Sequence, residues 1–232
     1  MTPGYIMTIV LRRAGIHNPS TEQKTSARDY LNLMKTELEG LTVWRFLYKV
    51  GTITTEDGTR AYSLGSDVLE PIGRFFDVTN DRMIDTIHPH TMDEEDPDQD
   101  YEAEQKQVAL TGINATTGYW SVDLYPTPDT TGESVKYRYY ASHPDLVEGD
   151  DDTDLAPKYP RYIQAPLLWG TAGMYKGEKE NDSESFEWQR YGSALESAIR
   201  INRRVSTSDP IQLPAGGETD NEFIIHGAVQ VD

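Results

Sequence analysis

One pattern of carboxylates in the sequence has the spacing of a calcium-binding loop. Asp150, Asp152 and Asp154 alternate along the chain, as the first ligands of an EF-hand loop do. Such a loop needs glycine at its sixth position and a bidentate glutamate at its twelfth, where this chain has Leu155 and Arg161. We therefore expect an acidic, solvated loop here and no calcium requirement.

Other residue types that could carry chemistry are sparse. His88 and His90 could present two imidazoles on one strand face, but no third metal ligand is evident nearby. The chain has no cysteine, which excludes disulfides and thiol catalysis, and it lacks the common phosphate-binding and hydrolase motifs. We predict no catalytic residue, no metal and no cofactor. A pair of glycosidase carboxylates that meet only in space remains an alternative, because 39 acidic residues are available.

The charge of the chain is concentrated in two segments. The formal net charge is -18, with 39 acidic and 21 basic residues. Residues 91–104 hold eight carboxylates and residues 145–154 hold six, in both cases without a lysine or arginine. We expect both segments to face solvent without nearby counter-charges, because unpaired buried carboxylates are too costly. The acidic balance disfavours a conventional DNA-binding domain, and no apolar run reaches the roughly 18 residues of a membrane helix.

The residues that surround these segments divide into helical and extended stretches. A short helix is expected over residues 5–14, and a longer one starts after Ser20, which forms a capping-box pattern with Gln23. This second helix should end at Gly40. Its apolar stripe has the spacing of one helix face and consists of Ala27, Tyr30, Leu31, Met34 and Leu38.

Residues 43–141 are rich in aromatic and branched residues and predict an antiparallel β unit. Asp57 and Gly58 lie between two β-prone runs, which predicts a hairpin at this point. The acidic segment 91–104 should interrupt the sheet as a short helix at its edge. Trp44, Phe46 and Leu47 are expected to anchor the preceding helix to the sheet.

The chain becomes helical again after residue 157. Pro160 suits a helix start, whereas Pro166 should kink or restart that helix. A last helix, capped by Asp182 or Ser183, carries the apolar stripe Trp188, Tyr191, Leu195, Ala198 and Ile199. The expected fold is α+β: N- and C-terminal helices packed as a small bundle, an inserted β domain and an extended tail. The expected boundaries are 1–50, 51–144, 145–205 and 206–232.

Several segments, taken in order, resemble the head-to-tail adaptor (head-completion) proteins of tailed bacteriophages. The likeness covers roughly residues 20–204 and includes the stretch 27–47, the hairpin pattern of 51–64, the stretches 83–98 and 122–146, and the closing helices 159–177 and 187–200. The positions that match the motifs of the family are Trp44, Phe46, Leu47, Thr55, Gly58, Thr59, Tyr62, Leu64, Asp93, Asp96, Pro97 and Asp98.

This resemblance implies a structural virion protein of the phage neck, made in the host cytoplasm. It implies a homo-oligomeric ring of about twelve copies beneath the portal protein, which extends the DNA channel and offers a surface to tail or nozzle proteins. Double-stranded DNA would pass without specific binding, and no membrane would be involved. One acidic segment would line the channel or the ring edge and repel DNA, through residues Asp93, Glu94, Glu95, Asp96, Asp150, Asp151 and Asp152.

The last segment of the chain has the composition of a linker followed by a docking strand. Residues 206–222 are rich in proline, glycine and polar residues, and the apolar segment 223–231 follows. We expect it to dock onto the portal or an adjacent subunit, through Phe223, Ile224, Ile225, Val229 and Val231. Two alternatives stay open from the residues: a virion-associated peptidoglycan hydrolase, and a carbohydrate- or receptor-binding β module.

Overall fold

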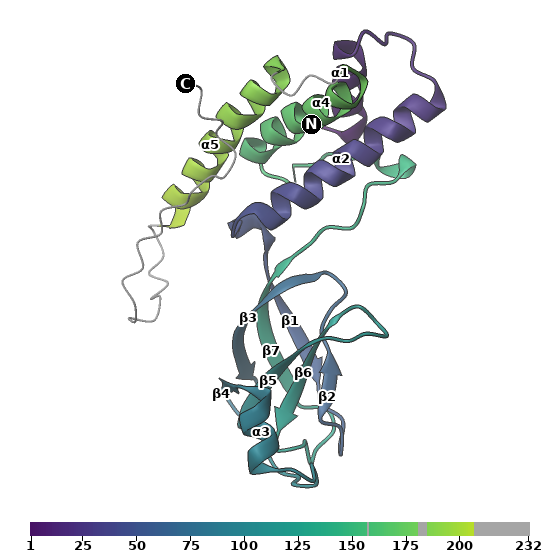
Figure 1. Ribbon diagram of the computed structural model, residues 1–232. Helices are drawn as coiled ribbons and strands as arrows, with labels where there is room; N and C mark the ends of the chain where they lie inside the picture. The colour runs from purple at the N-terminus through teal and green to yellow at the C-terminus, as the bar shows by residue number, and fades with distance from the viewer. Residues whose placement is uncertain (157, 181–184, 207–232) are drawn as a thin grey trace, which may run out of the picture.

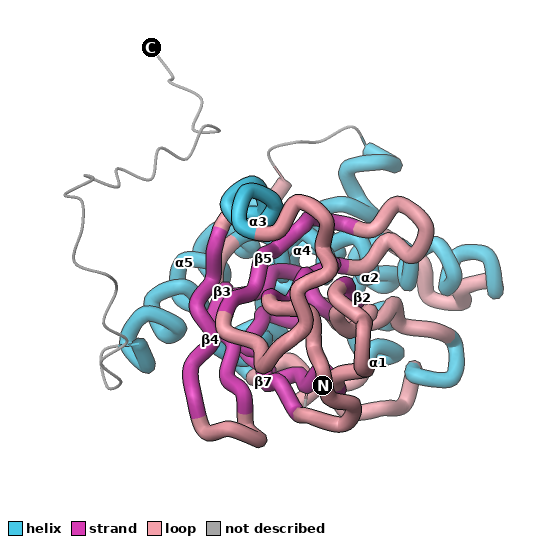
Figure 2. The backbone as a smooth tube through the Cα atoms, turned by 90° about the horizontal axis from the view of Figure 1, so that it is seen from below, coloured by secondary structure: helices cyan, strands magenta, loops and turns pink. Residues whose placement is uncertain are grey.

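The structure, a computed structural model, describes residues 1–156, 158–180 and 185–206. It consists of a helical bundle and a curled β sheet that lies below it in Figure 1. Viewed from below, the strands lie in front of the helices, so the two layers are stacked (Figure 2). The bundle is formed by helices α1 (Pro3–Arg13), α2 (Thr21–Leu41), α4 (Arg161–Glu180) and α5 (Phe186–Ser206). The α+β prediction is confirmed.

The two N-terminal helices have the caps that their sequences predict. The Ser20 side chain accepts a hydrogen bond from the backbone amide of Gln23, and the Gln23 side chain accepts one from the Ser20 amide, which completes the capping box of α2. Helix α1 begins at Pro3, and the hydroxyl of Thr2 caps it. The apolar stripe of α2 faces the core of the bundle, where Leu31 and Met34 are fully buried. Gly40 does not end α2, which continues to Leu41.

Helix α4 corrects one prediction. It runs continuously from Arg161 to Glu180 with Pro166 inside, so the expected restart at this proline is wrong. Four residues beyond Pro166 the helix packs closely against α2, since a Cβ atom at Gly170 would lie 1.9 Å from Sδ of Met34. The predicted caps of the last helix, Asp182 and Ser183, lie outside the described residues.

The sheet has seven strands in the order β1-β7-β3-β4-β5-β6-β2. All neighbouring pairs are antiparallel except β4 and β5, which are parallel. The short helix α3 (Pro89–Glu95) lies between these two strands in the sequence, as expected for an acidic insertion. The strands are β1 (Tyr48–Thr54), β2 (Ala61–Ser63), β3 (Val68–Asp77), β4 (Arg82–Ile87), β5 (Gln107–Ile113), β6 (Trp120–Tyr125) and β7 (Ser134–Ala141).

The predicted hairpin at Asp57 and Gly58 is wrong. Strand β1 pairs with β7, and β2 pairs with β6, so the two strands that flank this turn do not pair with each other. The turn itself exists, with Gly58 at a φ of +70°. The amides of this turn bond to another loop. Gly58 N donates to the carbonyl of Pro128 (2.9 Å), and Asp57 N donates to the hydroxyl of Thr131 (3.0 Å). These long-range contacts keep β1 and β2 from pairing with each other.

Two apolar cores lie inside the molecule, one in the bundle and one in the sheet. Trp44 and Leu47 belong to the core of the bundle, and Tyr140 of β7 packs against it. These contacts confirm the expected anchoring of helix to sheet. The sheet core consists of Ile53, Leu64, Phe75, Ile84, Val108, Val122, Leu124, Val135, Tyr137, Tyr139 and Ala141. No helix among the described residues is long and apolar enough to cross a membrane.

Candidate functional site

A polar face of α2 lies beside its apolar stripe and holds the chain segment that returns from the sheet. Arg28, Asn32, Lys35 and Glu39 follow at intervals of four, three and four residues, so they share one face of the helix. Residues 142–155, which we call the strap, run from the end of β7 along this face. The polar face of α2 and the strap together form the junction between bundle and sheet.

The outer half of the junction uses an arginine and an asparagine. Arg28 Nη2 donates to both carboxylate oxygens of Asp151, at 2.9 and 3.1 Å. Asn32 makes two hydrogen bonds with Leu146, donating from Nδ2 to its carbonyl (3.1 Å) and accepting its amide (2.8 Å). The backbone of the strap is thereby fixed against α2 at two points.

The inner half of the junction contains a buried lysine. Lys35 is 2% exposed, and its Nζ donates to Asp145 Oδ1 and to the carbonyl of His143, both at 2.8 Å. A buried ammonium group needs such partners, since a lone charge in the interior would be strongly destabilising. Asp145 belongs to the acidic segment 145–154, so this carboxylate neutralises a cation from a distant helix.

Glu39 is the centre of the innermost contacts. Its carboxylate is 4% exposed and accepts hydrogen bonds from the Tyr159 hydroxyl (2.6 Å) and the backbone amide of His143 (3.3 Å). His143 Nδ1 lies 2.9 Å from the same carboxylate. Burial raises the pKa of Tyr159 above its usual value, and the neighbouring charge of Glu39 raises it further. Tyr159 therefore stays protonated and donates to Glu39 over the ordinary pH range.

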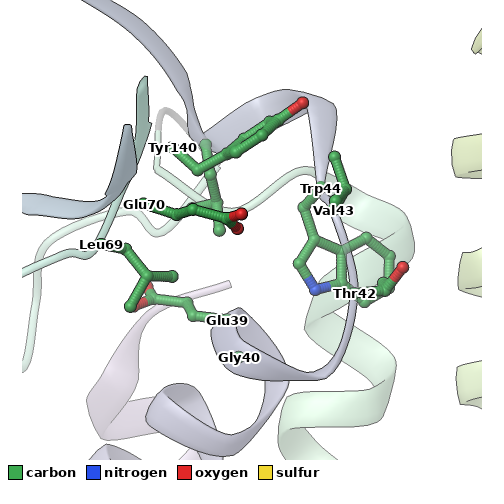
Figure 3. Close-up of a pocket in the computed structure, with 9 residues that line it drawn as sticks. Glu39, Gly40, Thr42, Val43, Trp44, Leu69, Glu70 and Tyr140 are labelled. Carbon is green, nitrogen blue, oxygen red and sulfur yellow. The ribbon is translucent and has the colours of Figure 1, made fainter. Parts of the chain in front are cut away.

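A pocket of about 370 Å³ opens at the junction (Figure 3). Its lining includes the fully buried Trp44, whose indole N–H donates to the carbonyl of Leu38. Glu70 of β3 points into the opening, and Tyr140 of β7 forms one wall (Figure 3). The complete lining is Glu39, Gly40, Thr42, Val43, Trp44, Leu47, Leu69, Glu70 and Tyr140.

This pocket brings two carboxylates together, which the hydrolase alternative requires. Glu39, however, is already bonded to Tyr159 and His143, and these contacts fix the path of the strap. A general acid or base needs a carboxyl group that is free to exchange a proton with a substrate. The geometry assigns Glu39 to holding the junction.

The acidic segment 91–104 lies at the far end of the sheet from the bundle, around α3 (Figure 1). Asp93, Glu94 and Glu95 are exposed, as predicted. Asp96 corrects the prediction, since it is 6% exposed and packs at the end of α3. The segment also has counter-charges, because Asp93 pairs with Arg60 (3.1 Å) and Glu104 with Arg82 (2.9 Å).

The acidic segment 145–154 lies within the strap, beside α1 and α2, at the opposite end of the molecule (Figure 1). Asp152 is exposed, whereas Asp150 and Asp151 are half-buried. Asp150 accepts the amide of Val147 (3.0 Å), and Asp154 pairs with the N-terminal amine (3.0 Å). The two acidic segments therefore do not form one surface, and the expectation that they lack counter-charges is wrong. The cations come from elements distant in sequence.

Neutralising carboxylates that pair with cations of α2 should affect stability more than neutralising carboxylates that are exposed at the tip of the sheet. The double substitution Asp145→Asn with Asp151→Asn should lower the free energy of unfolding by about 1–3 kcal/mol, because Lys35 and Arg28 lose charged partners. Asp98→Asn with Asp100→Asn, both exposed at the far end of the sheet, is the matched control and should change it by less than about 0.5 kcal/mol. Urea denaturation of the purified chains measures both. Equal losses would contradict the assignment.

The histidine and calcium-loop patterns have structural explanations. The Nδ1 atom of His88 accepts the amide of His90 (3.2 Å) and caps α3, while His90 pairs with Glu94 (3.3 Å). Within the described ranges, no three histidine or acidic side chains are grouped so that they could hold a metal ion. The predicted docking residues Phe223, Ile224, Ile225, Val229 and Val231 lie outside the described residues.

Sequence reasoning missed the polar face of α2, although its signal is visible in the sequence. Arg28, Asn32, Lys35 and Glu39 have the spacing of one helix face, immediately beside the apolar stripe. Polar residues at such positions are usually assigned to solvent. In the structure Lys35 and Glu39 are among the most buried polar residues of the bundle. The shared helix face was therefore the sequence signal for a polar contact between elements.

Polar contacts in the junction hold the helical layer and the sheet in a fixed relation. The model of the SU10 adaptor protein family matches residues 4–214. The chain belongs to this family of phage head-to-tail adaptors, which confirms the expected identity and implies a place in the virion neck. A comparison with curated proteins finds no match.

Proposed function

We propose that this protein forms a ring beneath the portal, extends the DNA channel and provides the surface to which the tail attaches. The match of residues 4–214 to the adaptor family carries this proposal. A ring of about twelve copies requires a head-to-tail interface that closes on itself. The portal and the tail or nozzle proteins are the partners.

The distribution of charge supports such an assembly. Each copy carries a formal charge of -18, and the two acidic segments lie at opposite ends of the molecule, next to the bundle and at the tip of the sheet. A ring of about twelve copies would carry on the order of -200 charges, which would repel passing DNA rather than bind it. Either Asp93, Glu94 and Glu95 at the tip of the sheet or Asp150–Asp152 in the strap would then face the channel.

The mass of the assembled protein tests the proposal. Native mass spectrometry of the full chain, alone and mixed with portal particles, should show a ring on the portal. Electron microscopy of the same particles should show the added density on the tail side of the portal. A chain that stays monomeric and does not associate with portal particles would overturn the proposed function.

A further inference from the structure

Strand β1 has a free edge. It is the first strand in the sheet order and pairs only with β7. The other end of the order is β2, which has three residues, whereas β1 has seven. Long free edges readily accept a further strand, and proteins usually shorten or cover them. The Tyr48 amide donates to the carbonyl of Arg45, and beyond Tyr48 no described residue bonds through its backbone to the outer side of β1.

The backbone groups that point outward from β1 can be identified. Thr55 N donates to the carbonyl of Glu133 (2.9 Å), so Thr55 faces β7. On the other side of β7, Val78 N donates to the carbonyl of Ser134 (2.8 Å), and Ser134 is the partner of Thr54. Because direction alternates along an antiparallel ladder, the amides of residues 49, 51 and 53 face β7, and those of residues 50, 52 and 54 face the free edge.

The edge also lacks the features that block strand addition. The register between β1 and β7 is continuous, without a bulge, and the strand contains no proline. Lys49 is bound to Asp67 at 2.8 Å and does not stand free at the edge. On the outer face, the side chains of Tyr48 and Val50 are 38% and 54% exposed. This edge thus offers both backbone groups and apolar side chains to a partner strand.

The chain leaves the described structure close to β1. Asn202, in the last turns of α5, donates from Nδ2 to the carbonyl of Val43 (2.8 Å) and accepts the amide of Arg45 (3.2 Å). These residues lead directly into β1. Figures 1 and 2 both show the C-terminal end of α5 at the side of the molecule, and in Figure 1 it lies beside the lower end of α2. A segment that follows from there is well placed to reach a neighbouring copy.

The sequence after α5 fits the edge in length, pattern and charge. A linker of about sixteen residues spans roughly 20–25 Å on average, close to the roughly 23 Å length of a seven-residue strand. Beyond the linker, Phe223 and Ile225, then Val229 and Val231, alternate with other residues as in a strand with one apolar face. Residues 206–232 carry five acidic and no basic residues, whereas Lys136 and Arg138 of β7 are exposed beside the edge.

We propose that residues 223–231 of a neighbouring copy add to the free edge of β1 as an eighth strand. The inference rests on the proposed ring, in which each copy would give its strand to the next and receive one in turn. The outward amides of residues 50, 52 and 54 would then be bonded across the subunit boundary.

Hydrogen exchange of the full-length protein tests the strand. In the assembled wild type, the amides of Val50, Thr52 and Thr54 should exchange at least roughly tenfold more slowly than in the variant Phe223→Ser with Ile225→Ser. The amides of residues 51 and 53, which face β7, should be unaffected. Ile211→Ser with Leu213→Ser, two apolar residues of the linker, is the matched control and should leave all five amides protected.

Cross-linking identifies the donor, since the chain has no native cysteine. A mixture of Thr52→Cys and Val229→Cys chains should form a disulfide-linked pair, and a mixture of Ser63→Cys and Val229→Cys chains, with the cysteine on β2, should not. A third sample is one chain that carries both Thr52→Cys and Val229→Cys. If a disulfide forms within this chain but not in the mixture of single variants, the assignment to a neighbouring copy is overturned. A ring that persists while residues 50, 52 and 54 exchange freely would overturn strand addition and leave the proposed function standing. A monomeric wild type that binds no portal would instead refute the ring.

Discussion

Replacing Glu39 with alanine is expected to lower the free energy of unfolding by about 3–5 kcal/mol. The substitution removes the acceptor of the Tyr159 hydroxyl and of the His143 amide, and both donors would remain buried without a partner. Glu39 also lies one helical turn from the buried Lys35, so its loss leaves that cation with less compensating charge. Urea denaturation followed by circular dichroism measures the change.

The control lies on the same helix. Glu37 is exposed, and Glu37→Ala should change the free energy of unfolding by less than about 0.5 kcal/mol. A double-mutant cycle between Glu39→Ala and Tyr159→Phe should give a coupling of about 0.5–3 kcal/mol, because the two side chains share a hydrogen bond. If Glu39→Ala is no more destabilising than Glu37→Ala, the buried carboxylate does not hold the junction.

Replacing Trp44 with alanine should also lower the free energy of unfolding by about 3–5 kcal/mol, because apolar packing is lost. The indole is fully buried, packs beside Phe46 with ring centroids 6.0 Å apart, and lines the junction pocket. Its removal would leave a cavity where the last turn of α2 meets the sheet. Thermal and urea denaturation both measure the loss.

The neighbouring Val43→Ala is the control for this substitution. Val43 is 53% exposed on the rim of the same pocket, so its truncation should have an effect within about 0.5 kcal/mol. Trp44→Phe should fall between the two, because it keeps an aromatic ring but loses the donor to the Leu38 carbonyl. A Trp44→Ala variant as stable as Val43→Ala would show that the junction does not depend on this side chain.

The features predicted correctly from the sequence are those that depend on neighbours along the chain. The capping box of Ser20 and Gln23 and the apolar stripe of α2 involve residues within a few turns of one helix. The short helix expected within the acidic segment 91–104 is present as α3, although it begins two residues earlier and ends at Glu95. Local propensity and periodicity are sufficient to predict such elements.

The features that were missed or wrong depend on contacts between distant residues. The turn at Gly58 has the right residues for a hairpin, yet contacts with the loop at residues 128–131 separate its two strands. Likewise, Lys35 and Asp145 form their pair across 110 positions. The acidic segments looked unpaired because their cations belong to other elements, and no pattern in one stretch of sequence can supply that information.

The arrangement of the strap has a mechanical consequence for a protein that stands between a capsid and a tail. Arg28, Asn32, Lys35 and Glu39 occupy roughly 16 Å of α2, and the strap runs along them in the opposite direction, starting at the sheet. A tensile force on the sheet therefore reaches α2 by two routes, directly through residues 42–47 and through the four attachments of the strap. Attachments loaded in parallel share the force, whereas those peeled apart fail one after another. A pull at the tip of the sheet is thus transmitted to the helices with little extension between them.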